Sequence, residues 1–227
     1  KINILSEKED KKKIEQKLRV SDIILIANGP SFEDSKKNLF SYVKYLDKQL
    51  EFLLKEKKKN AKIIYFSSIH VYENHESQEA NTSILLNSRS HYGIRNIVCE
   101  NLLLSKFKKK NINIIRLSNI FGIQKNLSKL SSSEFRLSVN NFCLNVVNNK
   151  KFLINSNLNE KRNFISINDF VNFIEKGFIL NKYKFNQIIN YTSRNEISLK
   201  QLINIIRLQS KKLKLKKPNI KFTNKTK

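Results

Sequence analysis

The chain of 227 residues contains no methionine and no tryptophan, and it has only four glycines, two prolines and two cysteines. Ordinary proteins hold roughly 7% glycine, so we expect each glycine here to occupy a position that only glycine serves. No apolar run of about twenty residues occurs, which excludes a membrane-spanning helix, and residues 1–20 lack the apolar core of a signal peptide. The absence of methionine at position 1 predicts a fragment or a processed product.

The two cysteines, Cys99 and Cys143, both lie in apolar patterns of helical period. We expect them to be reduced core residues of a cytoplasmic protein, because disulfides are rare in that compartment. The three histidines show no metal-ligand spacing with these cysteines. The sequence therefore predicts no metal site.

The formal net charge is +25, from 44 lysines and arginines against 19 acidic residues. Nucleic-acid-binding proteins cluster such charges to contact phosphates. Here the lysines are spread over nearly every predicted helix and arginine is rare, which favours a general compositional bias. We expect no specific nucleic-acid partner and no membrane partner, although an anionic small substrate would be attracted to this surface.

Apolar runs and helical periods alternate through the first half of the chain. Residues 22–26 form a continuous apolar run typical of a central parallel strand, and it ends at the turn residues Asn28 and Gly29. Residues 40–58 have a helical period with one apolar face, and residues 62–67 are a run of β-branched and aromatic residues. This order predicts a βαβ unit with parallel strands.

The alternation continues to the carboxyl end. Ser166 with Asp169, and Ser198 with Gln201, have the spacing of capping boxes, which predicts that a helix begins at each pair. We expect helices at 92–109, 135–147, from Ser166 to about Leu180 and at 199–208, with strands at 112–117, 152–154 and 187–191.

Hydroxyl groups stand where one predicted strand ends and the following long helix begins. The strand at 62–67 ends in Ser67 and Ser68, and Tyr92 opens the next helix. Ligands of open α/β sheets bind outside the carboxyl ends of the strands. A hydroxyl and a phenol at that edge suit proton transfer to or from a substrate oxygen.

Four short motifs carry a family resemblance. Residues 67–72 read S-S-I-H-V-Y, residues 92–96 read Y-G-I-R-N, residues 116–122 read R-L-S-N-I-F-G, and residues 162–169 read R-N-F-I-S-I-N-D. They resemble the S-S-x-x-V-Y-G, Y-x-x-x-K, R-x-x-N-x-x-G and R-D-[FY]-[IV]-x-[IV]-x-D patterns of the extended short-chain dehydrogenases/reductases, the sugar-nucleotide epimerase and dehydratase family. One departure matters, because Asn96 stands at the lysine of Y-x-x-x-K.

The resemblance implies an α/β fold, with a Rossmann-like parallel sheet flanked by helices and a small carboxyl-terminal substrate lobe. Residues 1–123 would form an incomplete NAD(P)-binding domain, and residues 124–227 the substrate-binding lobe, with residues 162–193 partly returning to the sheet. A dinucleotide-binding fold needs a glycine-rich turn after its first strand. No G-x-x-G-x-x-G turn occurs, so we expect the family's first βαβ unit to be missing.

The resemblance assigns catalytic roles to Tyr92 as general acid/base and to Ser68, which would bind the reacting oxygen. Asn96 occupies the third catalytic position. An asparagine replaces the hydrogen bond of the family's lysine but not its charge, and a tyrosine without a neighbouring cation is a poor base at neutral pH. Arg95 lies one residue away, on the helix turn that follows Tyr92, and we hypothesise that it supplies the missing charge.

Binding roles follow from the same motifs. Ser68, Asn119 and Arg162 would contact the substrate, with Arg162 at a diphosphate, because a guanidinium binds phosphate in a bidentate geometry. The residues expected to contact the cofactor, NAD or NADP, are Asn28, Gly29, Ser67, Tyr92 and Asn96.

The function implied is an NAD(P)-dependent nucleotide-sugar epimerase or reductase. The family's dehydratases carry acidic residues directly after the catalytic serine or threonine, where this chain has Ile69 and His70. The alternative is a non-catalytic dinucleotide-binding or regulatory protein that has lost the active-site lysine. The family's dimers imply a homodimer through the helices at 40–58 and 92–109.

Overall fold

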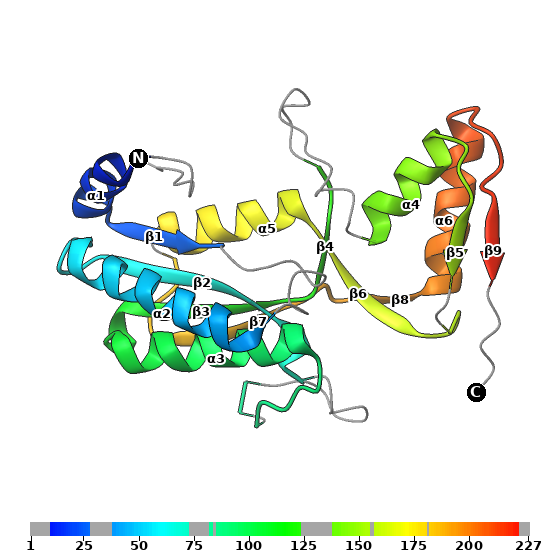
Figure 1. The fold of residues 1–227 in the computed structure, drawn as a ribbon. Coiled ribbons are helices and arrows are strands. Elements are labelled where there is room, and N and C mark those ends of the chain that lie inside the picture. Colours follow the sequence, from blue (N-terminus) through cyan, green and yellow to red (C-terminus); the bar gives the residue numbers. More distant parts are fainter. Residues whose placement is uncertain are drawn as a thin grey trace. The chain divides into compact units, whose positions relative to one another are not determined.

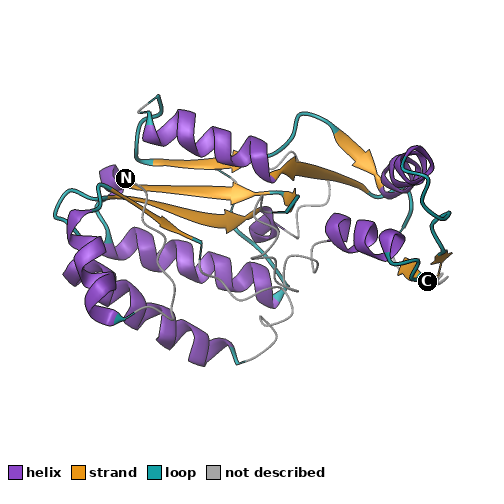
Figure 2. Cartoon of the chain, turned by 90° about the horizontal axis from the view of Figure 1, so that it is seen from above, coloured by secondary structure: helices purple, strands orange, loops and turns teal. Residues whose placement is uncertain are grey.

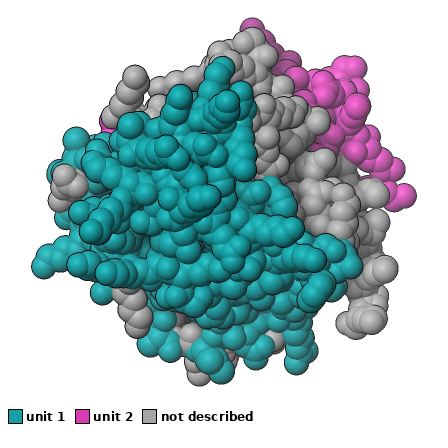
Figure 3. Space-filling view, turned by 60° about the vertical axis from the view of Figure 1, so that its left-hand side comes forward, with its two compact units in different colours: residues 1–117, 176–191 teal, residues 118–175, 192–227 magenta. Residues whose placement is uncertain are grey.

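The structure is a computed structural model that describes residues 10–27, 38–72, 82–83, 85–123, 138–154, 157–180 and 182–222. The chain divides into two compact units, which Figure 3 shows in different colours. Unit 1 consists of residues 1–117 and 176–191, and unit 2 consists of residues 118–175 and 192–227.

Unit 1 is built on a four-stranded parallel sheet in the order β1-β2-β3-β7 (Figure 1). The register aligns Ser67 with Arg116, and Arg116 with Asn190, across three neighbouring strands. These polar residues therefore lie together near the carboxyl ends of the strands. The strands are β1 (Ile23–Ile26), β2 (Lys62–Ser68), β3 (Ile112–Leu117) and β7 (Gln187–Tyr191).

The expected parallel α/β sheet flanked by helices is confirmed, with one correction. The run at 22–26 predicted a central strand, but β1 lies at one end of the sheet among the described residues. Ile24 is buried whereas Leu25, on the opposite side of the strand, is 38% exposed. A continuous apolar run shows that a strand is apolar on both faces, but it does not show how many neighbours the strand has.

Three helices of unit 1 begin at side-chain caps that satisfy free backbone N–H groups. Asp10 caps α1 (Lys11–Val20), Asn38 caps α2 (Leu39–Glu56) and Ser90 caps α3 (His91–Lys106). Short 3₁₀ turns follow β2 as η2 (Ile69–Tyr72) and precede β3 as η3 (Lys109–Asn111).

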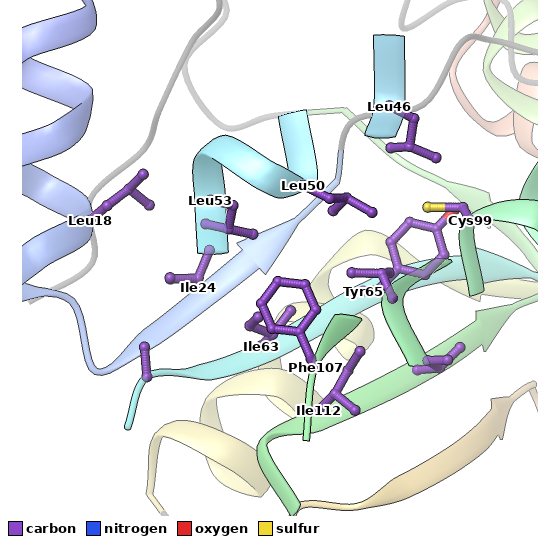
Figure 4. Packing of buried hydrophobic residues seen from close by; sticks show 13 residues of the cluster. Leu18, Ile24, Leu46, Leu50, Leu53, Ile63, Tyr65, Cys99, Phe107 and Ile112 are labelled. Carbon is purple, nitrogen blue, oxygen red and sulfur yellow. The ribbon is translucent and has the colours of Figure 1, made fainter. Parts of the chain in front are cut away.

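The core of unit 1 lies between the sheet and α2 and α3, which run against the same face of the sheet (Figures 1 and 2). Leu46, Leu50 and Leu53 of α2 pack with Cys99 of α3 on the sheet's apolar side chains (Figure 4). Leu103 of α3 belongs to the same cluster. Because a fully buried aliphatic side chain contributes about 1.5–3 kcal/mol, this layer holds α3, and with it Tyr92, in a fixed place over the strands.

Unit 2 contains short strands in two small sheets and three helices. β4 pairs in parallel with β6, β6 pairs antiparallel with β8, and β5 pairs in parallel with β9. The elements are β4 (Asn119–Phe121), α4 (Ser138–Val147), β5 (Phe152–Ile154), β6 (Lys161–Ser166), α5 (Ile167–Ile174), β8 (Glu196–Ser198), α6 (Leu199–Lys212) and β9 (Ile220–Phe222). The π-helical turn Glu175–Ile179 follows α5 directly, and from Lys176 on it belongs to unit 1.

Serine caps start two of these helices, as the sequence predicted. Ser166 accepts a hydrogen bond from the backbone N–H of Asp169, and its hydroxyl donates to the Asp169 carboxylate. Ser198 and Gln201 form a reciprocal capping box. α6 then continues to Lys212, four residues beyond the expected end, because Leu202, Ile203 and Ile206 bury one of its faces.

No helix within the described residues is long and apolar enough to cross a membrane. Of the three-residue strands, β5 matches the expected strand at 152–154, whereas β4, β8 and β9 were not predicted.

Candidate functional site

The two serines at the end of β2 face opposite sides, as successive strand residues do. Ser67 is 4% exposed, and its hydroxyl donates a 2.5 Å hydrogen bond to the carboxylate of Glu100. Ser68 is 5% exposed, and its oxygen accepts a hydrogen bond from the backbone N–H of His70 at 3.3 Å. Within the described part of the chain the Ser68 hydroxyl hydrogen has no acceptor, so Ser68 can donate to a ligand.

Tyr92 lies in the first turn of α3, directly beside the segment that follows β2. The hydroxyl of Ser90 caps the helix through the N–H of Gly93 at 2.9 Å. A Cβ on Gly93 would overlap the carbonyl oxygen of His70 and the hydroxyl of Ser88, so only glycine permits this close approach. The approach brings the rings of His70 and Tyr92 into edge contact, with 5.6 Å between their centroids.

Asn96 is 8% exposed, and the protein itself holds its amide. The Asn96 oxygen accepts a hydrogen bond from the hydroxyl of Tyr65 at 2.9 Å, and its nitrogen donates to the carbonyl of Tyr92 at 2.9 Å. One amide N–H of Asn96 remains without an acceptor in the part of the chain that is described. A neutral pair of Asn96 and Tyr65 thus occupies the place where the resemblance implies a cation.

Arg95 is 4% exposed and packs against α2. Its guanidinium lies over the ring of Tyr42, 4.4 Å from the ring centroid. Burial raises the pKa of Tyr42 to about 12, and the positive charge of Arg95 opposes that rise. Arg95 therefore contacts Tyr42, and the hypothesis that it supplies a charge to Tyr92 stays a prediction.

A buried ion pair lies under the carboxyl ends of the strands. Glu100, on α3, accepts hydrogen bonds from the Nε and Nη2 atoms of Arg116 at 3.1 and 2.7 Å. Their side chains are only 1% and 3% exposed. The hydroxyl of Ser67 donates to the same carboxylate, so Glu100 joins α3 to β2 and β3.

Tyr72 extends this network to β7. Arg116 donates through Nη1 to the Tyr72 hydroxyl, and that hydroxyl donates to the side-chain oxygen of Asn190 at 3.0 Å. Burial disfavours the charge on Arg116, but the hydrogen bonds and negative charge of Glu100 raise the pKa of Arg116 above its ordinary value. The guanidinium therefore stays charged, and it fixes three strands and a helix around the site.

Sequence reasoning did not single out Glu100 or Tyr72 as members of a network, and it treated Arg116 only as part of a motif. A signal was present, since Glu100 is an acidic residue on the apolar side of a helix that packs on a sheet. Charged groups in such positions are paired or neutralised. The sequence does not reveal the partner, because Arg116 meets Glu100 only through the packing of α3 on β3.

The other predicted binding residues lie away from the carboxyl end of β2 in the sequence. Asn28 and Gly29 lie outside the described residues. Asn119 and Arg162 belong to unit 2, where Asn119 donates to the carbonyl of Asn163 at 3.0 Å and Arg162 forms an exposed ion pair with Glu160 at 2.8 Å. Their roles in substrate binding stay predictions.

No group of three or more histidine, cysteine or acidic side chains with the geometry of a metal site is found among the described residues. Cys99 is buried and Cys143 is exposed, and neither forms a disulfide. The expected burial of both cysteines therefore holds for Cys99 and is wrong for Cys143, since the apolar pattern of α4 leaves that side chain on the surface.

The family model described as the NAD dependent epimerase/dehydratase family matches residues 5–188. The chain belongs to this family. A comparison with curated protein sequences gave no match.

Solved structures of the family share the fold. MoeE5 in complex with UDP-glucose and NAD has 13% sequence identity and a TM-score of 0.72 over 93% of this chain and 68% of its own length. TunA, an NAD-dependent NDP-hexosamine 5,6-dehydratase, has 18% identity and a TM-score of 0.70, and the match covers 92% of this chain and 66% of TunA. UDP-glucuronic acid 4-epimerase from Bacillus cereus, in complex with NAD, has 19% identity and a TM-score of 0.67. This match covers 92% of this chain and 64% of the epimerase. The family member described here thus spans about two thirds of the length of these structures.

Proposed function

We propose that the protein is an NAD(P)-dependent nucleotide-sugar epimerase or reductase in which Tyr92 transfers the proton and Ser68 orients the reacting oxygen. The observation that carries this proposal is the approach of α3 to the end of β2, where Gly93 packs on His70 and brings Tyr92 beside the segment that follows Ser68. Membership of the epimerase/dehydratase family and the NAD found in related structures support it.

The described residues fit a dinucleotide at this edge in part. Ser68 has a hydroxyl hydrogen to donate and Asn96 has one amide N–H to offer to a ribose hydroxyl. Ser67 does not fit the predicted cofactor contact equally well, because its hydroxyl already donates to Glu100. The bound dinucleotide would supply the hydride acceptor and donor.

In the proposed mechanism each residue acts on the substrate hydroxyl. The N–H of His70 polarises Ser68, and the Ser68 hydroxyl donates to the reacting oxygen. Tyr92 would act in its phenolate form, taking up the proton of that oxygen as the carbon is oxidised, and the phenol so formed would return the proton when the carbon is reduced from the other face. Arg162 would bind the diphosphate of the nucleotide sugar after leaving its exposed partner Glu160.

A titration of NADH and NADPH, followed by fluorescence, tests the cofactor on the intact protein. Tyr92→Phe should abolish turnover of nucleotide sugars while leaving NADH binding within about twofold, since the phenol is required for proton transfer and contributes little to affinity. The matched control is Tyr45→Phe, a half-exposed tyrosine on α2. Saturable binding with full activity in Tyr92→Phe would contradict the assigned role.

A second function is favoured by one observation. Position 96, where the resemblance implies a lysine, holds the neutral amide of Asn96. Tyr65 and the Tyr92 carbonyl form hydrogen bonds with that amide. The protein would then be a non-catalytic, dinucleotide-binding or regulatory member of the family. Saturable NADH binding with no turnover of any nucleotide sugar would select this function over the first.

We also propose a homodimer through α2 and α3, the helices that cover one face of the sheet. Phe40 and Tyr45 of α2 are 78% and 45% exposed. Burial of such side chains between two copies would favour association. Sedimentation of the wild type against Phe40→Ser tests this, and a monomeric wild type would contradict it.

A further inference from the structure

One end of unit 2 contains no acidic residue. Residues 138–154 and 197–222, which include α4, β5, α6 and β9, hold nine lysines and Arg207 but no aspartate or glutamate. The chain as a whole has 19 acidic residues among 227. The positive charge of this end therefore reflects the absence of acidic partners as well as the general abundance of lysine.

The fold gathers lysines from two distant segments at this end. After α6 the chain turns at Lys214, which has a φ of 55°, and the N–H of Leu215 bonds back to the carbonyl of Ser210 at 2.9 Å. The strand that follows, β9, pairs in parallel with β5, with Phe152 opposite Ile220. The segments that precede β5 and β9, which carry lysines, thus lie side by side (Figure 1). We name the set the basic end: Lys150, Lys151, Lys211, Lys212, Lys214, Lys216 and Lys217.

Every lysine of the basic end is exposed, and none takes part in an ion pair within the described residues. Unit 1 differs, because Lys106 pairs there with Asp47 at 2.8 Å and Lys58 pairs with Asp22 at 2.6 Å. Cations in the last turn of a helix are favoured by its dipole. That explains Lys211 and Lys212, but not the lysines that precede β5 and β9.

Exposed aliphatic side chains accompany these lysines. Leu208 and Leu213 are 62% and 68% exposed at the end of α6, and Val147 is 63% exposed at the end of α4. A helix with exposed apolar residues among lysines is typical of segments that lie in the interface of a membrane. Clusters of four to eight basic residues on such helices bind anionic lipid headgroups.

We propose that the basic end docks on the surface of an anionic lipid bilayer, with the lysines against the headgroups and Leu208 and Leu213 inserted between them. Nucleic acid fits less well. Only one arginine, Arg207, is present in these elements, whereas arginine is the residue that most often contacts base edges and stacks on bases. Docking on a membrane surface differs from the expectation, drawn from the sequence, of no membrane partner.

Co-sedimentation of the full chain with vesicles tests the proposal, using phosphatidylcholine alone and phosphatidylcholine with about one third phosphatidylserine. Lys212→Gln, Lys216→Gln and Lys217→Gln together should weaken binding to the anionic vesicles on the order of 100-fold, since each lysine near such a surface contributes a factor of about five. The matched control removes three exposed lysines of α2, namely Lys44, Lys48 and Lys55, and should change binding less than about threefold.

A second variant distinguishes insertion from charge alone. Leu208→Ser with Leu213→Ser should weaken vesicle binding about tenfold and leave its salt dependence unchanged. Equal binding to neutral vesicles, equal loss in both lysine variants, or tighter binding to single-stranded RNA that is indifferent to the leucine variant would each overturn the proposal. Circular dichroism confirms that the variants fold, which we expect because all the altered side chains are exposed.

Discussion

The two units differ in the polar groups that they bury. Unit 1 buries a charged network of Glu100, Arg116 and Tyr72 beneath its candidate site, and all seven tyrosines of the chain belong to it. Unit 2 keeps its Arg162–Glu160 pair exposed. In unit 2 the side-chain amide of Asn140 accepts a hydrogen bond from the N–H of Gly122 at 3.0 Å and donates one to the Gly122 carbonyl at 2.8 Å. A fully buried ion pair therefore lies where we propose that chemistry occurs.

The largest expected effect comes from breaking the buried ion pair. Glu100→Gln keeps the volume but leaves the charge of Arg116 buried without a counter-ion, and it should lower the free energy of unfolding by about 3–5 kcal/mol. Urea denaturation measures this. The matched change in unit 2, Glu160→Gln, removes an exposed pair and should cost less than about 1 kcal/mol. Equal losses in the two variants would remove the contrast between the units.

A lysine at position 96, the residue that the resemblance implies there, tests the neutral pair at the site. Asn96→Lys places an ammonium in a position that is 8% exposed and leaves the Tyr65 hydroxyl without its acceptor. We expect a loss of roughly 3 kcal/mol in the free energy of unfolding. Adding Tyr65→Phe should recover part of that loss, because the unsatisfied hydroxyl is then gone.

The control for this change is Asn101→Lys, an exposed position on the same helix, which should be nearly neutral. If the double variant gains turnover of a nucleotide sugar, the wild type lacks only the cation. A double variant that is no more stable than Asn96→Lys would show that Tyr65 and Asn96 are not coupled.

A smaller effect is expected where α3 meets the segment after β2. Gly93→Ala introduces a Cβ that would overlap the His70 carbonyl, so the helix must shift, at a cost of about 2 kcal/mol. Turnover should fall further than stability predicts, since Tyr92 moves with the helix. Thermal unfolding and activity are compared with those of Asn101→Ala, which leaves the contact intact. Unchanged activity in Gly93→Ala would argue against a role for this approach.

The smallest effect concerns alkaline pH. Burial raises the pKa of Tyr42 to about 12 from 10.0, and burial raises that of Cys99 to about 12 from 9.0. At a pH between the ordinary and the raised pKa of each group, the folded state binds more protons than the unfolded state. These two groups therefore leave the free energy of unfolding unchanged below pH 9 and lower it as pH rises towards 12. In Tyr42→Phe the urea midpoint should fall less steeply with pH between pH 10 and pH 12 than in the wild type. Tyr45→Phe, a half-exposed control, should leave the slope unchanged.

Much of the fold was predictable from local patterns. The strand at 112–117 and the strand at 187–191 match β3 and β7, and the capping serines Ser166 and Ser198 begin α5 and α6. These features depend on residues close together in the sequence, where side-chain alternation and capping chemistry act directly. Helix ends were less accurate, because the burial of distant residues decides how far a helix continues.

The candidate site was predictable only as a set of residues. Ser68 and Tyr92 were identified through a short motif, but the motif did not show that Ser67 turns to Glu100 or that Asn96 is held by Tyr65. Those contacts join residues more than thirty positions apart. They exist only because α3 packs on β2, and no periodicity within either segment encodes the pairing.

The sequence by itself determined the alternation of strands and helices, the strand-end hydroxyls and the family to which the chain belongs. Local propensities and short motifs specify these features without reference to distant parts of the chain. The tertiary structure alone decided the burial and pairing of Glu100 with Arg116, and the meeting of two lysine segments at the β5–β9 pair. Charges acquire partners, or lose them, only when packing brings separate segments within hydrogen-bond distance and excludes water between them.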